Sequence, residues 1–403
     1  MSRSNITKII IGVLFALAIV LGLIQHNRDP YFGSNKTTYQ LAAADKSLKT
    51  YFDQAKDMAK QADLKNGTTF LAVGDIMLSR NVAAEIKKQN DPALPFRQMA
   101  DILKSTDFNF GNFENPISST SPVIGGHSLI FGAPQKYTTG LKDYNFQILN
   151  LANNHAFDQG LKGLAYTKDY LNSLSIKTVG AGNNLDQAWT PAEIEANGLK
   201  ICFIGASYSS INDGGKTVND YVARIDDVKN LKSSISNLKS KCDFIVATMH
   251  AGVEYVRQPN QAQTDFAHAA IDAGADMVIG AHPHWIQTIE RYCPTPSSPA
   301  EGRMPAGQER LNCPNPKFIF YSLGNFIFDQ MWSRDTREGL ALKISLSKTS
   351  SPALQGPKVP ASLEKIELIP IIIDNYSTPR PATETEAKSI LKKIGETKNF
   401  LVP

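Results

Sequence analysis

The feature that most constrains the fold of this chain is a series of short apolar segments that alternate with helical patterns. Seven such segments are typical of buried strands: 68–75, 107–114, 146–155, 199–207, 243–252, 276–284 and 317–326. Helical periodicity lies between several of them, most clearly at 161–174 and 261–274. This alternation predicts an α/β domain with a largely buried sheet. Two later strand patterns, 339–346 and 362–373, have no helix pattern between them and indicate an antiparallel second sheet or edge.

The length and composition are those of a globular protein. The 403 residues allow two or three domains at the usual domain size. With 42% hydrophobic and 20% charged residues, the composition excludes wholesale disorder, a collagen-like repeat and a disulfide-dense small scaffold. The formal net charge of +4 is too small and too dispersed to favour nucleic acid as a partner. We find no internal repeat.

Near the N-terminus, an apolar run at residues 9–24 is the candidate transmembrane segment of this sequence. It has 16 residues, fewer than the roughly 20 that span a bilayer comfortably, but counting from Ile6 with snorkelling flanks makes it sufficient. Arg3 and Lys8 precede the run, which favours an N-terminus inside and the rest of the chain outside. A cleaved signal peptide is the alternative, although no small-x-small cleavage pattern follows. We predict an uncleaved anchor in residues 1–28 and an extracytoplasmic location, periplasmic or at the cell surface.

The rest of the chain divides into three further parts. Residues 29–66 are predicted to form a linker and a helix, with apolar side chains at helical spacing over 40–64 that are typical of a stalk or a cap. The main domain is predicted to span residues 67–375. Residues 376–403 are predicted to form a tail with an amphipathic helix at 383–396.

The four cysteines fall into two pairs with different surroundings. Cys293 and Cys313 bracket a Pro-rich stretch, and in an oxidising compartment the simplest interpretation is a disulfide that closes this 293–313 loop. Cys202 and Cys242 lie in or beside apolar runs, where free cysteine is a common core residue, and their pairing stays open. No spacing resembles a zinc knuckle or a redox CxxC motif.

The predicted strands end in residue types that bind metals. Five strand ends carry carboxylate, amide or imidazole side chains: Asp75; Glu114; Asn153, Asn154 and His155; His250; His282 and His284. Because the carboxyl ends of strands in an open α/β sheet converge on one edge, we expect these groups to meet there. A donor set of imidazole, carboxylate and amide oxygen, without a thiolate, suits a borderline divalent ion such as Zn, Mn or Fe.

The histidines also have a purely structural interpretation. Each of them, taken alone, is more often a core residue that satisfies its own hydrogen bonds than a ligand. His282 and His284 stand at i and i+2, which places both imidazoles on one side of an extended chain, and Pro283 between them stiffens the segment. We favour the metal interpretation because five separate strand ends carry ligand-type residues.

Nucleophile-based and nucleotide-binding chemistry is disfavoured by missing motifs. The sequence has no G-x-S-x-G elbow, no P-loop and no dinucleotide fingerprint. Ser207 and Ser322 follow apolar strands, but neither has a marked triad partner.

Six ordered segments carry a family resemblance: VGDIML, NFENPI, LNLANNHAFDQG, MHAGVEY, GAHPHWIQ and YSLGNFIFD. Over about residues 68–375 the chain resembles the bacterial capsule-synthesis CapA family, also called the poly-γ-glutamate synthesis proteins. That family belongs to the calcineurin-like metallophosphoesterase superfamily. The resemblance implies an α/β fold of the superfamily type, a four-layer αββα sandwich, preceded here by the predicted N-terminal transmembrane helix.

The resemblance also implies roles for individual residues. The implied metal ligands are Asp75, Glu114 as the bridging carboxylate, Asn154, His250, His282 and His284. Of these, His250 and His282 are expected at one metal position and His284 at the other. His155 matches the histidine that protonates the leaving group or holds the phosphate, and Asp158 is a candidate for orienting its imidazole.

The chain departs from the superfamily pattern at one ligand position. Met77 stands where the superfamily has a histidine two residues after the first Asp, so one metal position loses a ligand and the site holds either one tight ion or two unequal ones. Ala281 stands where the capsule family often has a further histidine. Asn325 and Asp329 belong to the family pattern, and they either act directly or cap a strand.

Further candidates lie close to the site motifs in sequence. Glu254 and Tyr255 are candidates for lining the cleft. Four arginines form either a local anion-binding rim or ordinary surface charge: Arg80, Arg257, Arg334 and Arg337.

The resemblance implies an accessory role in poly-γ-glutamate capsule synthesis and export, with one or two divalent ions (Mn, Zn or Fe) as cofactors. The expected partners are the membrane subunits of the capsule synthetase and exporter, with poly-γ-glutamate or another anionic substrate as ligand. Two alternatives stay open, a cell-envelope metal-dependent phosphoesterase and a non-catalytic scaffold of the capsule machinery. With two ions, a bridging water ionised near neutral pH would attack phosphorus or a carbonyl carbon, with His155 as general acid.

Overall fold

The computed structural model describes residues 67–209, 220–294, 315–348, 361–395 and residue 400. The chain divides into two compact units, Met1–Gly67 and Thr68–Pro403, and the fold described here is that of the second unit. The predicted anchor, linker and first helix lie outside the described residues. Among the described residues, no helix is long and apolar enough to cross a membrane.

The larger sheet has eight strands, seven of them in the order β16-β15-β14-β1-β2-β5-β6, with β13 paired to β1. β1, β2, β5 and β6 are parallel to one another, whereas β14, β15 and β16 are antiparallel to one another. The strands are β1 (Gly67–Ile76), β2 (Phe108–Phe113), β5 (Phe146–Asn150), β6 (Lys177–Val179), β13 (Asn325–Ile327), β14 (Glu338–Lys348), β15 (Ala361–Asp374) and β16 (Thr378–Pro381).

The smaller sheet has six strands in the order β11-β12-β10-β9-β8-β7. Its four central strands are parallel, and the edge strands β7 and β11 are antiparallel to their neighbours. The strands are β7 (Ala192–Ala196), β8 (Leu199–Ser207), β9 (Phe244–His250), β10 (Met277–Ala281), β11 (Ile289–Tyr292) and β12 (Lys317–Phe320). A separate pair is formed by β3 (Ile117–Ser118) and β4 (Ala133–Pro134).

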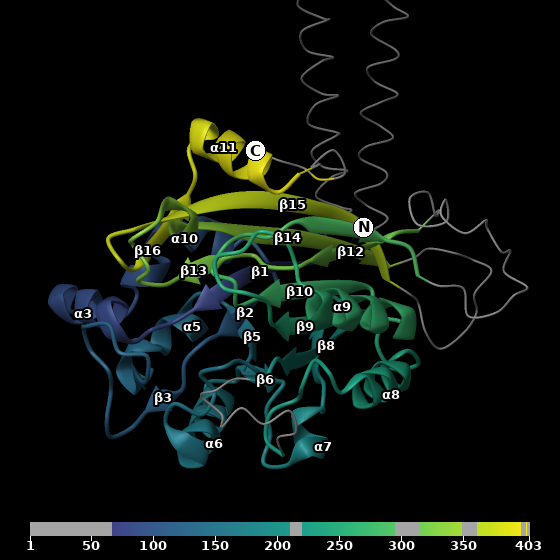
Figure 1. The fold of residues 1–403 in the computed structure, drawn as a ribbon, viewed down its shortest axis with the longest axis horizontal. Helices are drawn as coiled ribbons and strands as arrows, with labels where there is room; N and C mark the ends of the chain where they lie inside the picture. The colour runs from purple at the N-terminus through teal and green to yellow at the C-terminus, as the bar shows by residue number, and fades with distance from the viewer. Residues whose placement is uncertain (1–66, 210–219, 295–314, 349–360, 396–399, 401–403) are drawn as a thin grey trace, which may run out of the picture. The chain divides into compact units, whose positions relative to one another are not determined.

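The helices connect and cover these sheets (Figure 1). The α-helices are α3 (Arg80–Gln89), α4 (Ala100–Leu103), α5 (Thr139–Asp143), α6 (Gly160–Ser173), α7 (Leu185–Ala188), α8 (Val228–Leu238), α9 (Gln261–Ala273), α10 (Arg334–Arg337) and α11 (Glu384–Lys393). Two 3₁₀ helices are η1 (Leu94–Met99) and η2 (Gln135–Tyr137). The N-terminus of α9 is fixed by a capping box between Asn260 and Gln263.

The two sheets pack face to face because their central strands are apolar on both faces. Phe70, Phe108 and Phe110 of the larger sheet contact Phe203 of β8, with ring centroids 5.0 to 6.1 Å apart. The outer face of the smaller sheet packs on α8 and α9, and the outer face of the larger sheet packs on α3 and α6. The layers therefore run helix, sheet, sheet, helix.

The predicted α/β class is confirmed, with one change in how the strands are distributed. Each of the seven predicted strand segments contains a strand, and the predicted helices at 161–174, 261–274 and 383–396 correspond to α6, α9 and α11. The strands divide between two sheets, which the alternation alone did not predict but which agrees with the sandwich that the family resemblance implies. The late strands β14 and β15 extend the larger sheet, which is the edge arrangement of the two that the sequence left open.

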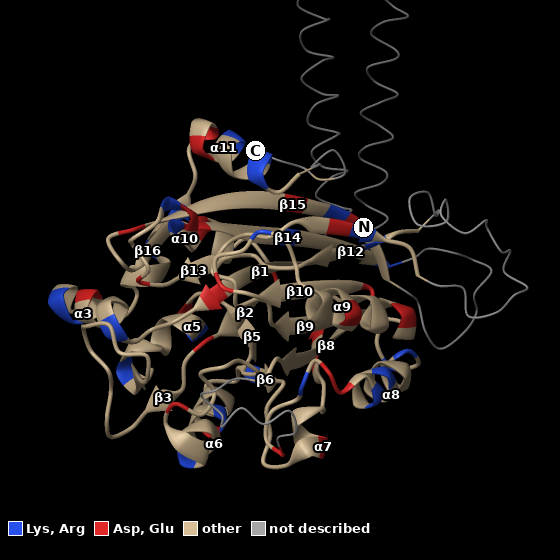
Figure 2. Ribbon diagram, in the orientation of Figure 1, with Lys and Arg blue, Asp and Glu red and all other residues tan. Residues whose placement is uncertain are grey.

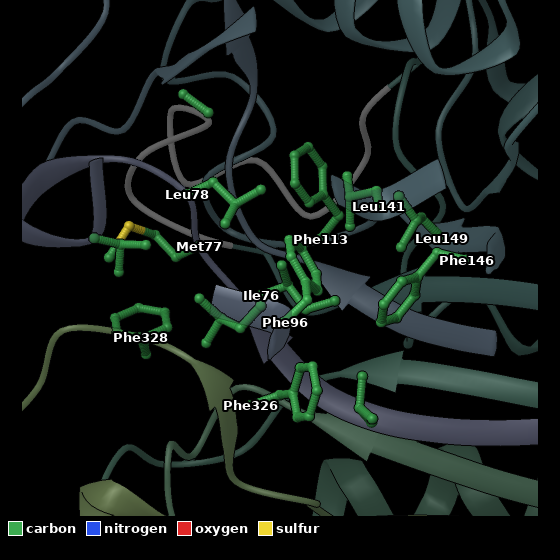
Figure 3. Close-up of a cluster of buried hydrophobic side chains, with 14 of the residues drawn as sticks. Ile76, Met77, Leu78, Phe96, Phe113, Leu141, Phe146, Leu149, Phe326 and Phe328 are labelled. Atoms are coloured by element: carbon green, nitrogen blue, oxygen red, sulfur yellow. The ribbon is translucent and has the colours of Figure 1, made fainter. Parts of the chain in front are cut away.

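A closely packed apolar cluster supports the ends of β1, β2 and β13. Figure 3 shows Ile76 within this cluster, with Phe113 and Phe326 on either side of it and with Met77 and Phe328 in the same cluster. All five side chains are at most 1% exposed. Dense packing of this kind holds the polar residues that follow these strands in fixed positions.

A disulfide joins Cys202 of β8 to Cys242, which lies just before β9, with their Cα atoms 5.9 Å apart. The pairing that the sequence left open is therefore formed, inside the cluster that α8 and α9 cover. Cys293 is also disulfide-bonded, and its predicted partner Cys313 lies outside the described residues.

Candidate metal centre

The polar strand ends of both sheets come together at one place. In the larger sheet, Asp75 lies near the end of β1 and Glu114 follows β2. In the smaller sheet, His250 ends β9, and His282 and His284 follow β10. These strands are parallel within each sheet, so their carboxyl ends lie at one edge. All five side chains are at most 3% exposed.

Glu114 lies at the middle of the group. Its Oε1 is 3.8 Å from His250 Nε2, 3.9 Å from His155 Nε2 and 4.0 Å from His284 Nε2. On one side, His284 Nδ1 lies 3.4 Å from Asp75 Oδ2. On the other side, His250 Nε2 lies 2.8 Å from Asn154 Oδ1.

The side chains form two overlapping sets of possible ligands that share Glu114. One set is Glu114, His250 and His282, the other is Asp75, Glu114 and His284, and within each set the ligand atoms lie within 4.8 Å of one another. Ligands about 2.0–2.2 Å from a tetrahedral ion lie about 3–4 Å from each other, so each set suits one ion after small adjustments. The described residues contain one further group of this kind, Glu193 with Cys202 and Cys242, but its thiols are used in the disulfide.

Three buried ligand-type atoms have no hydrogen-bond partner among the described residues. They are both carboxylate oxygens of Glu114 and Nδ1 of His282. A buried polar atom without a partner costs free energy, and an uncompensated buried carboxylate costs more. A bound cation would satisfy all three atoms, so the residues present fit a divalent metal.

Burial shifts the pKa values of these groups. Burial raises the pKa of Glu114 well above its usual range, and the nearby Asp75 carboxylate raises it further. Burial lowers the pKa values of His250 and His282 well below the usual range, and the neighbouring imidazoles add to both shifts. The two imidazoles are therefore neutral at pH 7, which is the form that binds metals.

Two asparagines that the sequence analysis missed connect the strands beneath the centre. Asn150 Nδ2 donates to Asn112 Oδ1 at 2.8 Å, and Asn112 Nδ2 donates to Asp75 Oδ1 at 2.8 Å. The same Asn112 nitrogen lies 3.0 Å from His250 Nδ1. The sequence signal that could have identified them is a polar residue inside an apolar strand, as in NFGNFE and in FQILN.

His155 is fixed by Asp158 and Phe131. Its Nδ1 lies 2.7 Å from Asp158 Oδ2, and the ring of Phe131 stacks on the imidazole with centroids 3.7 Å apart. Asp158 is held in turn by the backbone N–H of Phe131, which donates to Oδ2 at 2.6 Å. The imidazole thus presents Nε2 toward Glu114, as the arrangement of a histidine oriented by a carboxylate requires.

The segment that carries His282 and His284 is not extended, contrary to the sequence-based expectation. β10 ends at Ala281, and the two histidines have φ values of 103° and 57°. Arg80 and Tyr255, with φ values of 49° and 63°, share this left-handed backbone. Such conformations cost about 1–3 kcal/mol each and cluster at functional sites.

A close backbone approach places Asp75 beside Asn325. A side chain at Gly74 would lie 1.8 Å from the carbonyl oxygen of Gly324, so only glycine allows this contact. Asp75 N donates to that oxygen at 3.1 Å, and Asn325 Oδ1 lies 2.9 Å from His284 Nδ1. Asn325 therefore positions the imidazole of His284.

The remaining candidates surround the centre. Arg80 forms an ion pair with Asp329, and its guanidinium lies over the Phe131 ring at 4.6 Å. Burial raises the pKa of Tyr255, whose ring lies 6.0 Å from His284, and Glu254 beside it is exposed. Met77 does not offer a free sulfur, because Ser79 donates to it from N at 3.1 Å and from Oγ at 3.0 Å.

Like Arg80, the other three arginines considered for an anion-binding rim are paired with carboxylates. Arg257 pairs with Asp335. Arg334 pairs with Glu338 at 3.0 Å, and Arg337 pairs with Asp374 at 3.1 Å. Each of these three arginines is thus ion-paired within the fold, and the anion-binding rim stays a prediction.

Residues 69–330 match the family model described as bacterial capsule synthesis protein PGA_cap. The chain belongs to this family. It is 31% identical over 332 residues to the PGA biosynthesis protein CapA of Bacillus subtilis (strain 168), covering 81% of this chain and 78% of that one. It is 28% identical over 332 residues to the capsule biosynthesis protein CapA of Bacillus anthracis, covering 80% and 71%. The capsule-synthesis resemblance in the sequence is thereby confirmed.

The chain is also similar to solved structures at lower identity. One is a putative 5'-nucleotidase from Staphylococcus aureus, 16% identical with a TM-score of 0.46, covering 81% of this chain and 58% of that chain. Another is the calcineurin-like phosphoesterase YfkN from Bacillus subtilis, 15% identical with a TM-score of 0.43, covering 81% and 96%. This chain thus spans little more than half the length of the nucleotidase.

Proposed function

We propose that this member of the capsule-synthesis family is an extracytoplasmic, membrane-anchored component of poly-γ-glutamate capsule synthesis and export, and that it hydrolyses a phosphate ester at a divalent-metal centre. The metal part rests on one observation, the buried Glu114 carboxylate without a partner among three imidazoles. The capsule part rests on family membership and on the CapA relatives. The four layers agree with the metallophosphoesterase-type sandwich that the sequence resemblance implies.

The donor set suits Mn, Zn or Fe, because imidazole nitrogens combine with carboxylate and amide oxygens. The two positions are unequal. Glu114, Asn154, His250 and His282 supply four groups to one position, whereas Asp75, Glu114 and His284 supply three to the other. We therefore expect one tightly held ion and one weaker, more open position.

The roles of the protein residues follow from their positions. Bound divalent ions would supply Lewis acidity and lower the pKa of a water molecule so that it attacks phosphorus near neutral pH. His155, held by Asp158, would deliver a proton to the departing oxygen. Asn112 and Asn325 keep Asp75, His250 and His284 in place by hydrogen bonds.

The proposed location has independent support from the cysteines. Cys202 and Cys242 form a disulfide, and Cys293 is disulfide-bonded as well. Disulfides persist mainly in oxidising compartments outside the cytoplasm. The partners we propose are the membrane subunits that make and export the polymer, with an anionic substrate at the centre.

The proposed function is tested with the full-length protein loaded with manganese. We expect metal analysis to find bound ions, and aryl phosphate hydrolysis to fall about 10²–10⁴-fold in His155→Ala without loss of the ions. His268→Ala is the matched control, because His268 pairs with Glu290 away from the centre. Bound metal without hydrolysis, combined with loss of surface polyglutamate on gene deletion, would contradict the hydrolytic part and leave the capsule role. Absence of bound metal would favour a scaffold.

A further inference from the structure

The described part of the chain exposes eight large apolar side chains, and six of them lie in three loops next to the candidate centre. They are Ile124, Leu129 and Ile130 in one loop, Val253 and Val256 in the second, and Trp332 in the third. We name these six side chains the apolar rim. Single exposed apolar residues are ordinary, but a group of them beside a polar site indicates a surface that binds a ligand.

The first loop of the apolar rim is attached to the histidine proposed as the general acid. Leu129 and Ile130 are 77% and 57% exposed and directly precede Phe131, whose ring stacks on His155 at 3.7 Å. Phe131 is fixed to the same segment through its N–H to Asp158 and through its carbonyl oxygen, which accepts from Gln159 Nε2 at 2.8 Å. An apolar group resting on Leu129 or Ile130 is therefore held next to His155.

The other two loops are attached to the metal-ligand histidines in the same way. Tyr255 stands between Val253 and Val256, and its N–H donates at 2.9 Å to the carbonyl oxygen of Pro283, between His282 and His284. Its ring lies 4.9 Å from that of Trp332, which is 64% exposed. Phe328 completes the connection, 4.7 Å from the His284 ring and 6.1 Å from Phe131.

We propose that the substrate is an amphiphilic phosphate ester, with its phosphate in the centre and the hydrocarbon part of its alcohol on the apolar rim. This inference rests on the proposed hydrolytic function. In the reaction, a P–O bond forms to the attacking water oxygen and the P–O bond to the alcohol oxygen breaks. The alcohol oxygen takes its proton from His155, and the proton that the attacking water gives up passes to solvent, from which His155 is reprotonated. The apolar alcohol leaves along the rim segment that directly precedes Phe131.

A protein partner on this surface is the less favoured occupant. A standard protein interface has about 20–30 residues on each side. The apolar rim supplies six side chains, and all three of its loops are bonded to or in ring contact with residues of the centre. An occupant that covers the rim thus reaches the reacting groups, as a substrate does.

The inference is tested by kcat/KM for straight-chain alkyl phosphates, from ethyl to decyl, with the full-length manganese-loaded protein. We expect kcat/KM to rise about two- to fourfold per added methylene over the shorter members, since each buried methylene favours binding by about that factor. Leu129→Ser should flatten this rise. Leu161→Ser is the matched control, since Leu161 is 47% exposed on α6 and lies outside the rim, and it should leave the rise unchanged. Calorimetric titration with the corresponding alkyl phosphonates should show the same dependence in Kd.

The outcomes separate this inference from the function on which it rests. All the esters could be hydrolysed at similar rates, with phosphonate binding independent of chain length. This result overturns the inference of an amphiphilic substrate but leaves the proposed phosphoesterase function standing. Absence of both hydrolysis and phosphonate binding overturns the proposed function. A flat series combined with capsule loss in cells carrying Leu129→Ser assigns the apolar rim to a protein partner and also overturns the inference.

Discussion

Glu114 and Glu338 are both fully buried carboxylates, but of the two only Glu338 is ion-paired with Lys or Arg side chains among the described residues. Glu338 at the start of β14 binds Arg334 Nε at 3.0 Å and Lys393 Nζ at 2.5 Å. Figure 2 shows charges of both signs on α10 and α11, which supply these two cations. Neither oxygen of Glu114 has a hydrogen-bond partner among the described residues.

This difference in the partners of the two carboxylates indicates a different role for each region. Removing a carboxylate from water is tolerated when an opposite charge and hydrogen bonds replace the lost hydration. Around Glu338 the chain supplies that charge itself, so the arrangement stabilises the fold. Around Glu114 the described residues supply imidazoles and the Asp75 carboxylate, which leave its pKa well above the usual range, so a bound cation is the partner that we propose for its ionised form.

The largest expected effect is a loss of metal affinity, which should follow substitution of Glu114 but not of Glu338. Glu114→Gln removes the group shared by both ligand sets, so we expect a loss of metal affinity beyond the about 10–100-fold seen when only outer-shell partners are removed. The metal-free variant should be at least as stable as the metal-free wild-type protein, because a neutral amide of the same shape replaces a buried carboxyl whose ionised form burial disfavours. Calorimetric metal titration and urea unfolding measure the two quantities.

Glu338→Gln is the reciprocal variant and should give the opposite pattern. It leaves Arg334 and Lys393 without their shared carboxylate, so we expect the free energy of unfolding to fall by about 1–3 kcal/mol. Metal affinity should stay at the wild-type value. Equal effects of the two variants on metal binding would remove the distinction between the regions.

Asn112 provides the next test, because it ties together the carboxylate of Asp75 and the imidazole of His250. Asn112→Ala is expected to lower metal affinity about 10–100-fold, as loss of outer-shell partners does. Asn109→Ala on the same strand is the matched control, since Asn109 Nδ2 donates to the carbonyl oxygens of Leu103 and Tyr144 and its Oδ1 accepts from Thr106 Oγ1. The control should lower stability without changing metal affinity, and a similar loss of affinity in both would make the effect a general one of strand β2.

The strands and their polar ends were predictable because both are local in the sequence. An apolar run followed by Asp75, Glu114 or His250 is visible within about ten residues, and the parallel arrangement then brings those ends together. The division into two sheets depends on which strands pair, which local patterns do not specify. The alternation of strands and helices alone therefore predicted a buried sheet without this division, and the two-sheet sandwich was implied only by the family resemblance.

The features that the sequence did not reveal depend on contacts between distant segments. Cys202 and Cys242 are 40 residues apart in apolar surroundings, where a free thiol and a disulfide look alike. Asn112 and Asn150 read as interruptions of strands until the strands are placed side by side. The lack of partners around Glu114 is likewise a property of the packed structure and has no local signature.

The smallest expected effect concerns acid stability in the region of Glu338. Glu386 belongs to the same ion-pair network, because Arg334 lies 3.6 Å from it, and its hydrogen bond to Arg380 lowers its pKa to about 2. A lowered pKa in the folded state stabilises the protein fully above the unfolded value of 4.5, and this contribution is lost as the pH falls toward about 2. Because the pair is partly exposed, we expect its contribution to the free energy of unfolding to be only about 1 kcal/mol.

Glu386→Gln should therefore lower the free energy of unfolding by about that amount at pH 7 and by progressively less between pH 4.5 and pH 2. Glu384→Gln on the same helix is the control, since that side chain is 78% exposed, and it should follow the wild-type pH profile. If the free energies of unfolding of Glu386→Gln and wild type differed by the same amount across this pH range, Glu386 would contribute by packing and not by its charge.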